Sequence, residues 1–333
     1  MANLVNDPTD FKEEMIEGMA AAYSRYWKRV PNAAGVMAHG APKEGQVSVI
    51  NGGGSGHYPT FAGVVGEGIL SASVIGDVFT SPSGEQVYRV SKAVDGGAGI
   101  LFCIANYSGD VMNFKMAGMR LEDDGVEVES VIITDDVASG GPDEREKRRG
   151  VAGGFYVYKC VGASAARGDD LQTAKRIGDK VNERIRTYGV AFAGCTLPGQ
   201  SEPLFTVDEG KMELGLGIHG EPGVETGDLR PAHEVADIML ERILADAPKD
   251  VGNRVGVLVN TLGRTSPEEL FVLYKSVHEK LGGDFDIYRP RVDHVVSSLD
   301  MAGCSLTLFW LDDELQELVE APSSTPAYTH IGG

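Results

Sequence analysis

Glycine-rich turns placed directly after short apolar runs are the feature that most limits how this chain folds. The run QVSVI at 46–50 leads into Asn-Gly-Gly-Gly-Ser-Gly-His at 51–57, and GILFCIA at 99–105 leads into Asn-Tyr-Ser-Gly-Asp at 106–110. An apolar run that ends in glycine and gives way to a helix is typical of a strand-to-helix turn. With a third strand predicted at 128–134, this rhythm indicates an α/β protein with a parallel sheet.

Helical periodicity supports the same fold class and suggests where one domain ends. Apolar residues recur at helical spacing over 10–28 and again over 170–188. Either Asp169 or Asp170 is placed to cap the second of these helices, and Gly189 is placed to end it.

We place the domain boundary at the end of this second helix. Residues 1–189 are expected to form an N-terminal α/β domain that carries the GGGSGH and NYSGD turns, and 190–333 a C-terminal α/β domain. Two domains suit the length of 333 residues. Within the second domain, a capping box at Ser266 predicts a helix start. The other elements predicted there are strands near 190–195, 203–207, 212–217, 254–262 and 305–311, and a helix at 232–246.

Charge and cysteine content exclude several classes of protein. A net charge of −19 argues against a protein that binds nucleic acid or an anionic membrane surface, because both depend on Lys and Arg. The four cysteines are widely separated and form no C-x-x-C pair, which favours reduced thiols over a disulfide framework or a zinc site. No signal peptide is visible, and no apolar run reaches the ~18 residues of a membrane span. A cytoplasmic protein is therefore expected.

The turn at 51–57 is the first candidate for a ligand site. Glycines at the carboxyl end of a strand let backbone N–H groups approach a ligand, and α/β sheets bind their ligands at that end. His57 stands where a P-loop has Lys and where a nucleophile elbow has Gly, so neither motif is present. The alternative without a function is a glycine turn capped by His57.

Asp110 and His219 are the other candidates. Asp110 follows a buried strand, where a carboxylate can accept a hydroxyl proton, although a helix N-cap is the more frequent role at such a position. His219 lies in GLGIHGEPG, and this rigid, glycine-rich context indicates an accessible imidazole rather than a core residue. A neutral imidazole can act as a base, a metal ligand or a nucleophile toward a carbonyl. Nothing in the spacing demands a metal, and none is predicted.

Taken together, these segments resemble the DhaK family, the dihydroxyacetone-binding subunits of dihydroxyacetone kinases. GGGSGH and GxGIHGEPG at this separation are highly specific to the family. The resemblance implies a two-domain fold of the DAK1/DegV kind, with a three-layer α/β/α first domain and an α/β sandwich as the second. The similar segments run nearly from end to end: NGGGSGHYP, GDVFTSPS, NYSGD, RRGVAGG, MELGLGIHGEPG, LVNTLG and SLDMAGCSLTLFWLDDEL.

The resemblance also implies a chemical role for each candidate. His219 matches the histidine whose ring nitrogen adds to the substrate carbonyl and forms a hemiaminal, which selects ketones or aldehydes over polyols such as glycerol. His57 and Asp110 match the polar pair that withdraws the proton of the hydroxyl to be phosphorylated. Three residues match the segment whose backbone binds the substrate: Gly54, Ser55 and Gly56.

In this family the phosphate donor is bound by another module. A DhaL-type helical barrel carries ATP, or ADP recharged by a phosphotransferase relay, together with Mg²⁺. The absence of a P-loop in this chain agrees with such a division. The resemblance therefore implies a separate DhaL-type subunit as partner, no cofactor bound by this chain itself, and a homodimer.

Two departures from the family pattern concern the substrate. This chain has Tyr58 where the family commonly has Glu after Gly-His, and Ala105 where the family commonly has Lys before the Asn-Tyr pair. Ala105 removes a hydrogen-bond donor and opens space, and Tyr58 supplies a different polar tip. Both residues are assigned to the substrate site. The expected substrate is dihydroxyacetone or a larger short ketose such as erythrulose or apulose.

The sequence leaves two alternatives to the ketose kinase. A non-catalytic, ketose-sensing transcriptional coactivator of the same family would bind the ligand without phosphorylating it. A lipid carrier of the DegV kind is disfavoured because its site does not need His219. Retention of His57, Asp110 and His219 together favours the kinase.

Overall fold

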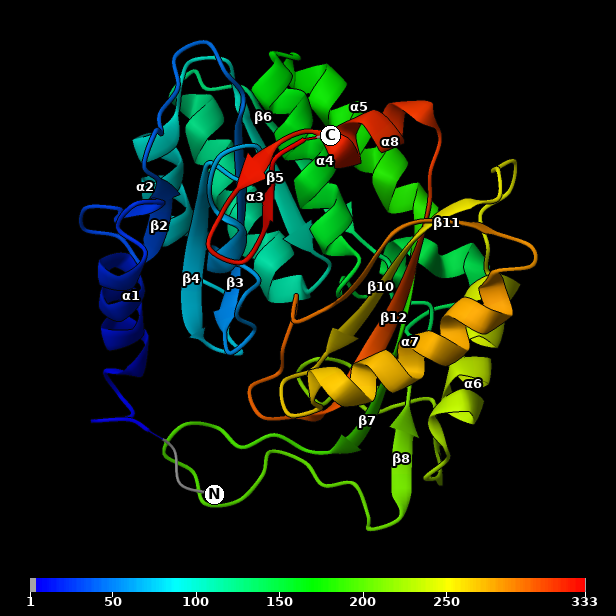
Figure 1. The fold of residues 1–333 in the computed structure, drawn as a ribbon. Coiled ribbons are helices and arrows are strands. Elements are labelled where there is room, and N and C mark those ends of the chain that lie inside the picture. The colour runs from blue at the N-terminus through cyan, green and yellow to red at the C-terminus, as the bar shows by residue number, and fades with distance from the viewer. Residues whose placement is uncertain (1–3, 333) are drawn as a thin grey trace. The chain divides into compact units, whose positions relative to one another are not determined.

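The computed structural model describes residues 4–332, which form two units (Figure 1). The first, here called the glycine-loop unit, consists of three segments: 4–133, 154–182 and 315–332. The second, here called the histidine unit, consists of two segments: 134–153 and 183–314. Each unit is described by itself below.

This division differs from the single boundary at residue 189 that the sequence suggested. The helix predicted over 170–188 is capped by Asp170, as expected, but it ends at Arg184. Ile185 already belongs to a strand of the histidine unit. The apolar spacing happens to continue past the helix end, but Ile-Arg-Thr-Tyr-Gly-Val is rich in β-branched and aromatic residues, and its pairing within a sheet decides its conformation.

A six-stranded sheet forms the centre of the glycine-loop unit, with the strand order β1-β2-β4-β3-β5-β6 (Figure 1). Strands β4, β3, β5 and β6 run parallel, whereas β1 pairs with β2 and β2 with β4 in the antiparallel direction. The parallel sheet predicted from the sequence is therefore confirmed. In chain order the strands span Trp27–Arg29, Gly35–Ala38, Ser48–Ser55, Ala72–Val78, Ile100–Ala105 and Val128–Ile133.

Helices cover both faces of this sheet. Helices α2 and α3 pack on one face through a core that includes Val87, Phe102 and Phe114. Helices α4 and α5 lie on the other face, where Gly178 of α5 allows a close approach to Val131 of β6. The three-layer α/β/α arrangement is therefore confirmed. The helices α2 to α5 span Gly84–Val94, Ser108–Asp123, Gly154–Arg167 and Leu171–Arg184.

The two ends of the described chain complete the glycine-loop unit. Helix α1 (Phe11–Ala22) is shorter than the predicted 10–28, because the buried Trp27 opens β1 instead of continuing the helix. At the other end, Lys159 of α4 donates two hydrogen bonds of 2.8 Å to carbonyl oxygens of the returning chain. That returning chain forms α8 (Asp313–Glu320), β13 (Ser323–Ser324) and β14 (Thr329–His330).

The glycine run lies within β3 rather than in a turn after it. A Cβ atom at Gly52 would lie 2.6 Å from the carbonyl oxygen of Val74, and one at Gly53 would lie 2.3 Å from the ring of Phe61. A larger residue at either position would displace a neighbouring strand or the Phe61 ring. The glycines therefore serve close packing at this end of the strand as well as backbone freedom.

The histidine unit is built on a mixed six-stranded sheet with the order β11-β10-β12-β7-β8-β9. Within this sheet, as far as the structure describes it, the β10–β11 pair is parallel and the other neighbouring pairs are antiparallel. Helices α6 (Ala232–Ala245) and α7 (Pro267–Leu281) cover one face through apolar side chains such as Met239 and Leu273. This is the expected α/β sandwich. The strands β7 to β12 span Ile185–Ala193, Lys211–Leu214, Glu225–Asp228, Arg254–Thr261, Asp286–Asp293 and Ala302–Trp310.

The second half of the sequence predicts the central elements of this unit better than its edges. The capping box at Ser266 is confirmed as the start of α7. Residues 203–207 form no strand in the structure, and the strands β9 and β11 were not predicted. Both β9 and β11 are edge strands with largely polar sequences, so they lack the apolar pattern from which a strand is predicted.

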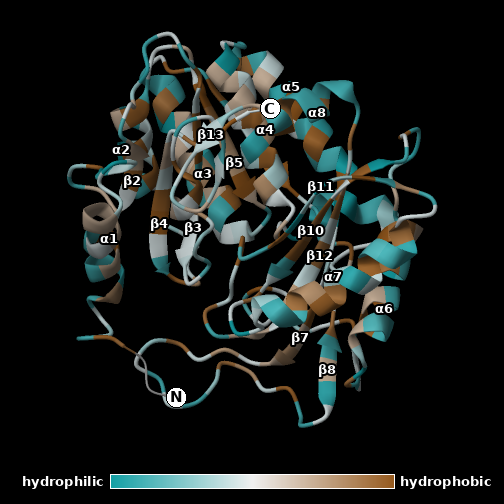
Figure 2. Cartoon of the chain, viewed as in Figure 1, coloured by the Kyte–Doolittle hydropathy of each residue, from teal (hydrophilic) through white to brown (hydrophobic). Residues whose placement is uncertain are grey.

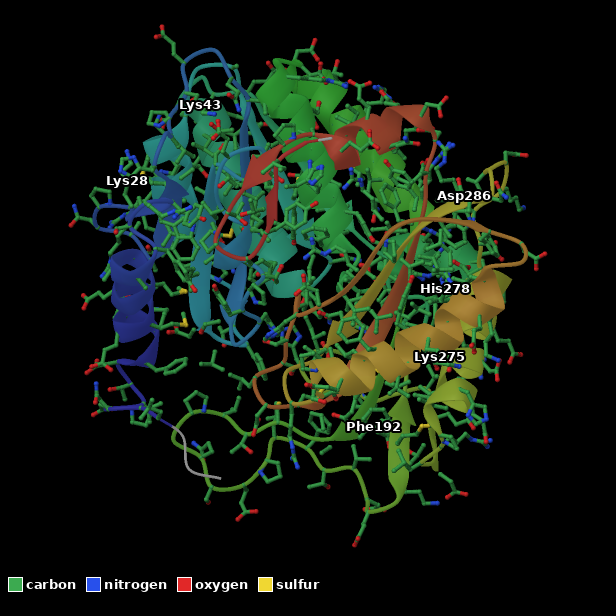
Figure 3. The ribbon with its side chains drawn as sticks, in the orientation of Figure 1. Lys28, Lys43, Phe192, Lys275, His278 and Asp286 are labelled. Carbon is green, nitrogen blue, oxygen red and sulfur yellow. The ribbon has the colours of Figure 1, made fainter. Side chains whose placement is uncertain are left out.

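The surface helix α7 buries Leu273 and Val277, although Phe271 and Val272 are exposed on it. Figure 2 shows apolar and polar residues alternating along α7, the pattern of an amphipathic helix. Lys275 and His278 lie on the exposed side of that helix (Figure 3). All four cysteines are buried and none is in a disulfide. Among residues 4–332, no helix combines the length and apolar character that crossing a membrane requires.

Candidate functional site

The carboxyl edge of the glycine-loop sheet is a topological switch point. From the central strand β3 the chain continues to β4 on one side, and later places β5 on the other side. The ladder between β3 and β5 ends at the pair Ile50–Phe102, although β3 extends to Ser55 and β5 to Ala105. Loops that leave a sheet at such a point form the ligand crevice of open α/β folds.

His57 is held rigidly at this edge, directly after β3. Its side chain is buried, at 1% exposure, and its ring stacks on Phe79 with centroids 4.9 Å apart and planes 16° apart. Phe61 meets the same ring edge to face, at 6.2 Å. Gly56, with a φ of +100°, allows the turn that brings the imidazole between these two rings. A histidine that only caps a turn does not need to be buried between two aromatic rings. The packing of His57 therefore favours a ligand site over a simple turn cap.

Ser55 and Thr60 flank His57 with buried hydroxyl groups. Within the described part of the chain, neither hydroxyl has a hydrogen-bond partner in the structure. A buried hydroxyl without a partner carries a desolvation cost that a polar ligand can relieve. A small hollow of about 20 Å³ opens beside both residues, and it is also lined by Gly54, Gly56 and Tyr58.

Asp110 lies in the first turn of α3, which begins where the loop after β5 ends. The residue at the N-cap position is Tyr107, so the alternative role of Asp110 as the N-cap is wrong. Asp110 is 7% exposed, and it lies in the first turn of the helix, where the helix dipole attracts negative charge. Asn113 fixes the turn by donating to the carbonyl oxygen of Gly109 and accepting from the backbone N–H of Gly84.

Ala105 and Tyr58 lie at the same edge as these groups. Ala105 is the buried last residue of β5, and it presents only a methyl group there. Burial raises the pKa of Tyr58, and so does a hydrogen bond with Tyr23, so the phenol stays protonated at neutral pH. Tyr58 lines the same small hollow as Gly54 and Gly56, whereas Ala105 ends the neighbouring strand β5.

A larger cavity lies at the opposite edge of this sheet and contains none of the predicted site residues. Its volume is about 280 Å³, and Lys43, Ser48 and Ser71 line it where β3 and β4 begin. Figure 3 labels Lys43 on the loop at that end. Ligands of parallel sheets bind at the carboxyl ends of the strands. The larger cavity is therefore not the candidate site.

His219 lies in the histidine unit, on the loop that joins β8 to β9. The loop is shaped by Gly215 and Gly220, whose φ angles of +74° and +81° favour glycine. Ser298 anchors it by donating a hydrogen bond to the carbonyl oxygen of Ile218. The His219 side chain is 24% exposed, which agrees with the accessible imidazole that the sequence predicted.

Glu221 accepts hydrogen bonds from both the ring and the backbone of His219, a role that the sequence did not predict. Its Oε1 lies 3.0 Å from Nδ1 of the ring, and its Oε2 accepts the backbone N–H of His219 at 3.0 Å. Burial alone would raise the pKa of Glu221, but these contacts with His219 outweigh it and lower the pKa to about 2. The only signal in the sequence was an acidic residue two positions after the histidine.

The ionised carboxylate determines the tautomer of the imidazole. A carboxylate can only accept, so Nδ1 of His219 must carry the hydrogen that Glu221 accepts. In the neutral ring this leaves the lone pair on Nε2. The arrangement holds a nitrogen nucleophile or base in one orientation, as a carboxylate does for histidine in many active sites.

The predicted site residues are thus divided between the two units. The structure brings His57 and Asp110 to one edge of the glycine-loop sheet, together with Gly54 to Gly56, Tyr58 and Ala105. It places His219, with Glu221, in the histidine unit.

Comparisons with known proteins identify relatives over nearly the whole chain. The Dak1 domain profile matches residues 17–327. The chain is 47% identical over 329 residues to the D-erythrulose kinase of Mycolicibacterium smegmatis and 43% identical over 333 residues to the L-erythrulose kinase of Pectobacterium atrosepticum. Each of these matches covers 98% of this chain but 56% of the relative, so the chain spans about half the length of these two kinases.

A relative of similar length is the dihydroxyacetone-binding subunit DhaK of the PTS-dependent dihydroxyacetone kinase 2 of Listeria innocua. It is 40% identical over 330 residues, with 98% of this chain and 99% of that protein covered.

The solved structures similar to this chain include a dihydroxyacetone kinase and a co-activator of a dihydroxyacetone kinase operon. The dihydroxyacetone kinase of C. freundii superposes with a TM-score of 0.91 and 32% identity, and 98% of this chain and 60% of that one are covered. The dihydroxyacetone kinase operon co-activator Dha-DhaQ superposes with a TM-score of 0.90 and 28% identity, with 96% and 98% covered. A fatty-acid-binding DegV family protein from Thermus thermophilus shares the fold alone, with a TM-score of 0.51, 12% identity, and 80% and 100% covered. The expected fold of the DAK1/DegV kind is confirmed.

Proposed function

Because the chain belongs to the Dak1 family, we propose that it is the ketose-binding part of a dihydroxyacetone-type kinase. It holds dihydroxyacetone or a related short ketose as a hemiaminal on His219 while the terminal hydroxyl is phosphorylated. The observation that carries this proposal is the 3.0 Å contact between Nδ1 of His219 and the ionised Glu221, since it leaves the nucleophilic lone pair on Nε2.

In the proposed covalent step, the Nε2 lone pair of His219 forms a bond to the carbonyl carbon of the ketose while the C=O π bond breaks. The carbonyl oxygen takes a proton from the solvent, which gives a hemiaminal attached to a cationic ring. Glu221 accepts the Nδ1–H of that ring and offsets its charge. The adduct restricts the motion of the terminal hydroxyl, which is a positioning contribution to phosphoryl transfer.

His57 and Asp110 are proposed to serve that hydroxyl. They withdraw its proton as the oxygen bonds to the γ-phosphorus of ATP and the bond from that phosphorus to ADP breaks. Support comes from the buried, ring-stacked His57 and from Asp110 in the first turn of α3. Gly54, Ser55 and Gly56 are proposed to bind the substrate beside them, where Ser55 offers a buried hydroxyl without a partner within residues 4–332.

The donor is proposed to be bound by a DhaL-type module in a separate subunit. That module would carry ATP, or ADP recharged by a phosphotransferase relay, with Mg²⁺. The proposal is supported by the full-length similarity to a DhaK subunit and by the absence of a P-loop in the sequence. The two erythrulose kinases are about twice as long as this chain, so a donor module joined to the same polypeptide is the arrangement that an experiment must distinguish.

The preferred substrate is proposed to be a ketose larger than dihydroxyacetone, such as erythrulose or apulose. Ala105 offers a methyl group at the edge of β5, and Tyr58 offers a neutral phenol. A small side chain leaves room for an additional hydroxymethyl group, and a neutral phenol can bind its hydroxyl. The names of the two erythrulose kinase relatives support the same choice.

The protein is also proposed to be a cytoplasmic homodimer. Size-exclusion chromatography with light scattering tests whether it is a dimer.

A ketose-sensing coactivator is the second candidate. The observation in its favour is the similarity to the co-activator Dha-DhaQ over nearly the full length of both chains. Such a protein binds the ketose but transfers no phosphate, so turnover separates the two functions.

The test combines native mass spectrometry with a coupled kinase assay in the presence of a DhaL-type subunit. The ketoses are dihydroxyacetone, both erythrulose enantiomers and apulose. The full chain is expected to gain the mass of one ketose and to turn over at least one of them. His219→Ala is expected to lose both properties, whereas His278→Ala, a substitution on the exposed side of α7, is expected to keep them.

Each other result has a definite meaning. Undiminished turnover by His219→Ala excludes the covalent adduct from the reaction. An adduct without turnover of any ketose supports the coactivator. The absence of both adduct and turnover in the wild-type protein rejects the proposed function.

A further inference from the structure

We propose that Arg149 is a positioning residue for His219 and that it acts through the carboxylate of Glu221. The inference rests on the proposed function for what His219 does, but the way in which His219 is held is argued from the structure of the histidine unit alone. Arg149 belongs to the RRGVAGG segment, which the chemistry proposed above does not use.

Three groups surround the guanidinium of Arg149. Its Nε donates to Oδ2 of Asp136 at 2.8 Å, and its Nη2 lies 2.7 Å from the same oxygen. Nη2 also donates to the carbonyl oxygen of Gly215 at 3.0 Å, at the start of the loop that carries His219. Nη1 lies 4.0 Å from Oε2 of Glu221. Arg149 therefore joins Asp136 to both the backbone and the carboxylate of the His219 loop.

The arginine and its aspartate are themselves fixed by the backbone. The N–H of Asp136 donates to the carbonyl oxygen of Arg149 at 3.1 Å, and Oδ1 of Asp136 accepts the N–H of Ala138 at 3.0 Å. The N–H of Arg149 donates to Oγ of Ser139 at 2.9 Å. The side chains are 14% exposed for Arg149 and 4% exposed for Asp136. A group anchored in this way can orient its neighbour, because it loses little conformational entropy in doing so.

The position of Gly217 is independent evidence that the loop accommodates the pairing of Arg149 with Glu221. A Cβ atom at Gly217 would lie 2.0 Å from Oε2 of Glu221 and 2.5 Å from Nη1 of Arg149. Both distances are far below contact, so any side chain at this position would push the carboxylate and the guanidinium away. The glycine therefore leaves the space in which the two charged groups face each other.

The charges of the three groups suit this role. Burial raises the pKa of Asp136 to about 6, although Arg149 opposes the rise. The pKa of Glu221 is lowered to about 2. At neutral pH both carboxylates are therefore ionised, and the guanidinium lies between them. Without the guanidinium, Oε2 of Glu221 would be held, within the described part of the chain, only by the backbone N–H of His219. The carboxylate would then be less fixed, and the His219 ring would lose a rigid hydrogen-bond partner.

The adjacent arginine shows that the contact is particular to Arg149. Arg148 makes a bidentate pair with Asp246, at 2.7 and 2.9 Å, and donates to the carbonyl oxygen of Gly140 at 2.8 Å. Arg148 is also buried and belongs to the same segment, but these two partners, Asp246 and Gly140, lie outside the His219 loop. It is therefore a matched control for the loss of a buried arginine.

The experiment measures the ring of His219 directly in the full chain. The protein is labelled with ¹⁵N-histidine, and His219→Gln assigns the ring signals. In wild type they should report hydrogen on Nδ1. In Arg149→Met the Nδ1–H tautomer should lose population, and the apparent dissociation constant of the ketose adduct should rise about 10-fold or more. Arg149→Lys should recover only part of the effect, because an ammonium lacks the planar fork of a guanidinium.

The controls separate positioning from stability. Arg148→Met should lower the melting temperature but leave the ring signals and the adduct as in wild type. If Arg149→Met fails to fold, Asp136→Asn, which removes the charge but keeps the shape, should shift the tautomer in the same direction.

Wild-type ring signals and wild-type adduct formation in folded Arg149→Met would assign Arg149 a purely structural role and overturn the proposal. If wild type forms no adduct with any ketose, the function proposed for His219 fails, and the ring signals still decide whether Arg149 positions it.

Discussion

At the scale of single residues, the proposed role of His219 requires a Glu221 carboxylate that stays ionised at neutral pH. Glu221 meets this requirement because His219 donates to both of its oxygens, one from the ring and one from the backbone. The contact stabilises the native state only while the carboxylate is charged. It therefore links the geometry of the candidate nucleophile to the pH dependence of stability.

The pH dependence of Glu221→Gln follows from this pKa. The native pKa of about 2 lies below the ordinary value of 4.5, so the stabilisation by the ionised group is complete above about pH 4.5 and is lost as the pH falls toward 2. The difference in urea midpoint between wild type and Glu221→Gln should thus be constant between pH 7 and about pH 5 and should shrink at lower pH. A difference that grows as the pH falls from 4.5 toward 2 would contradict the hydrogen-bonded geometry of the ionised carboxylate.

The sequence predicted individual site residues where glycine context marked them, and it missed those whose role depends on contacts. His57 and His219 stand out because each follows a glycine-rich stretch, and Asp110 stands out because it follows a buried strand. Glu221 acts through a two-residue turn that brings its carboxylate back to Nδ1, and no pattern of residue types encodes that turn. Arg149 is distant in sequence from the loop that it contacts, so only the fold reveals the contact.

At the scale of secondary-structure elements, helix ends were predicted where a side chain caps them. The capping box of α7 is a local motif, since Ser266 accepts the N–H of Glu269 and Glu269 accepts the N–H of Ser266. By contrast, the end of α5 at Arg184 depends on pairing of the following residues with β12, which is a long-range contact. A helix end set by a neighbouring side chain can be predicted from the sequence. A helix end set by long-range strand pairing cannot, because tertiary contacts override local helix propensity.

The capping box of α7 predicts the effect of Ser266→Ala. This substitution removes the acceptor for the Glu269 N–H and should lower the free energy of unfolding by about 1 kcal/mol. Urea unfolding measures the change, which should appear as a lower midpoint with an unchanged slope. Ser266→Asp keeps an acceptor at the N-cap and should restore most of the loss. Equal losses in both variants would show that the cap does not stabilise the helix.

At the scale of the whole molecule, the unexpected feature is the interleaving of the two units along the chain. The α/β class with a parallel sheet was predicted from local strand and helix patterns, whereas the layers were predicted from the resemblance to the DhaK family. The return of residues 315–332 to the glycine-loop unit was not, because its anchors are backbone carbonyl oxygens, which every residue has. Lys159 is fully buried and holds two of these oxygens, those of Leu318 and Ala321.

Lys159→Met should release the returning segment. The substitution removes the donor for two partly or fully buried carbonyl oxygens, at an expected cost of about 1–3 kcal/mol for each group left without a partner. Limited proteolysis should then cleave within 315–332 faster than in wild type. Lys175→Met, which removes a lysine from a partly exposed pair with Asp179, should leave the cleavage rate unchanged. Protection of the segment in Lys159→Met would indicate that other contacts hold it.

The interleaving also has a consequence for biosynthesis. A ribosome that adds ~5–20 residues per second completes 183–314 before it reaches 315–332. The histidine unit therefore has all its segments first, while the glycine-loop unit still lacks α8 and the final hairpin for about 1–4 seconds more. During this interval the apolar faces that later receive Leu315 and Leu318 are exposed to solvent, where a chaperone can bind them. The unit that is begun first by the ribosome is thus the one that is finished last.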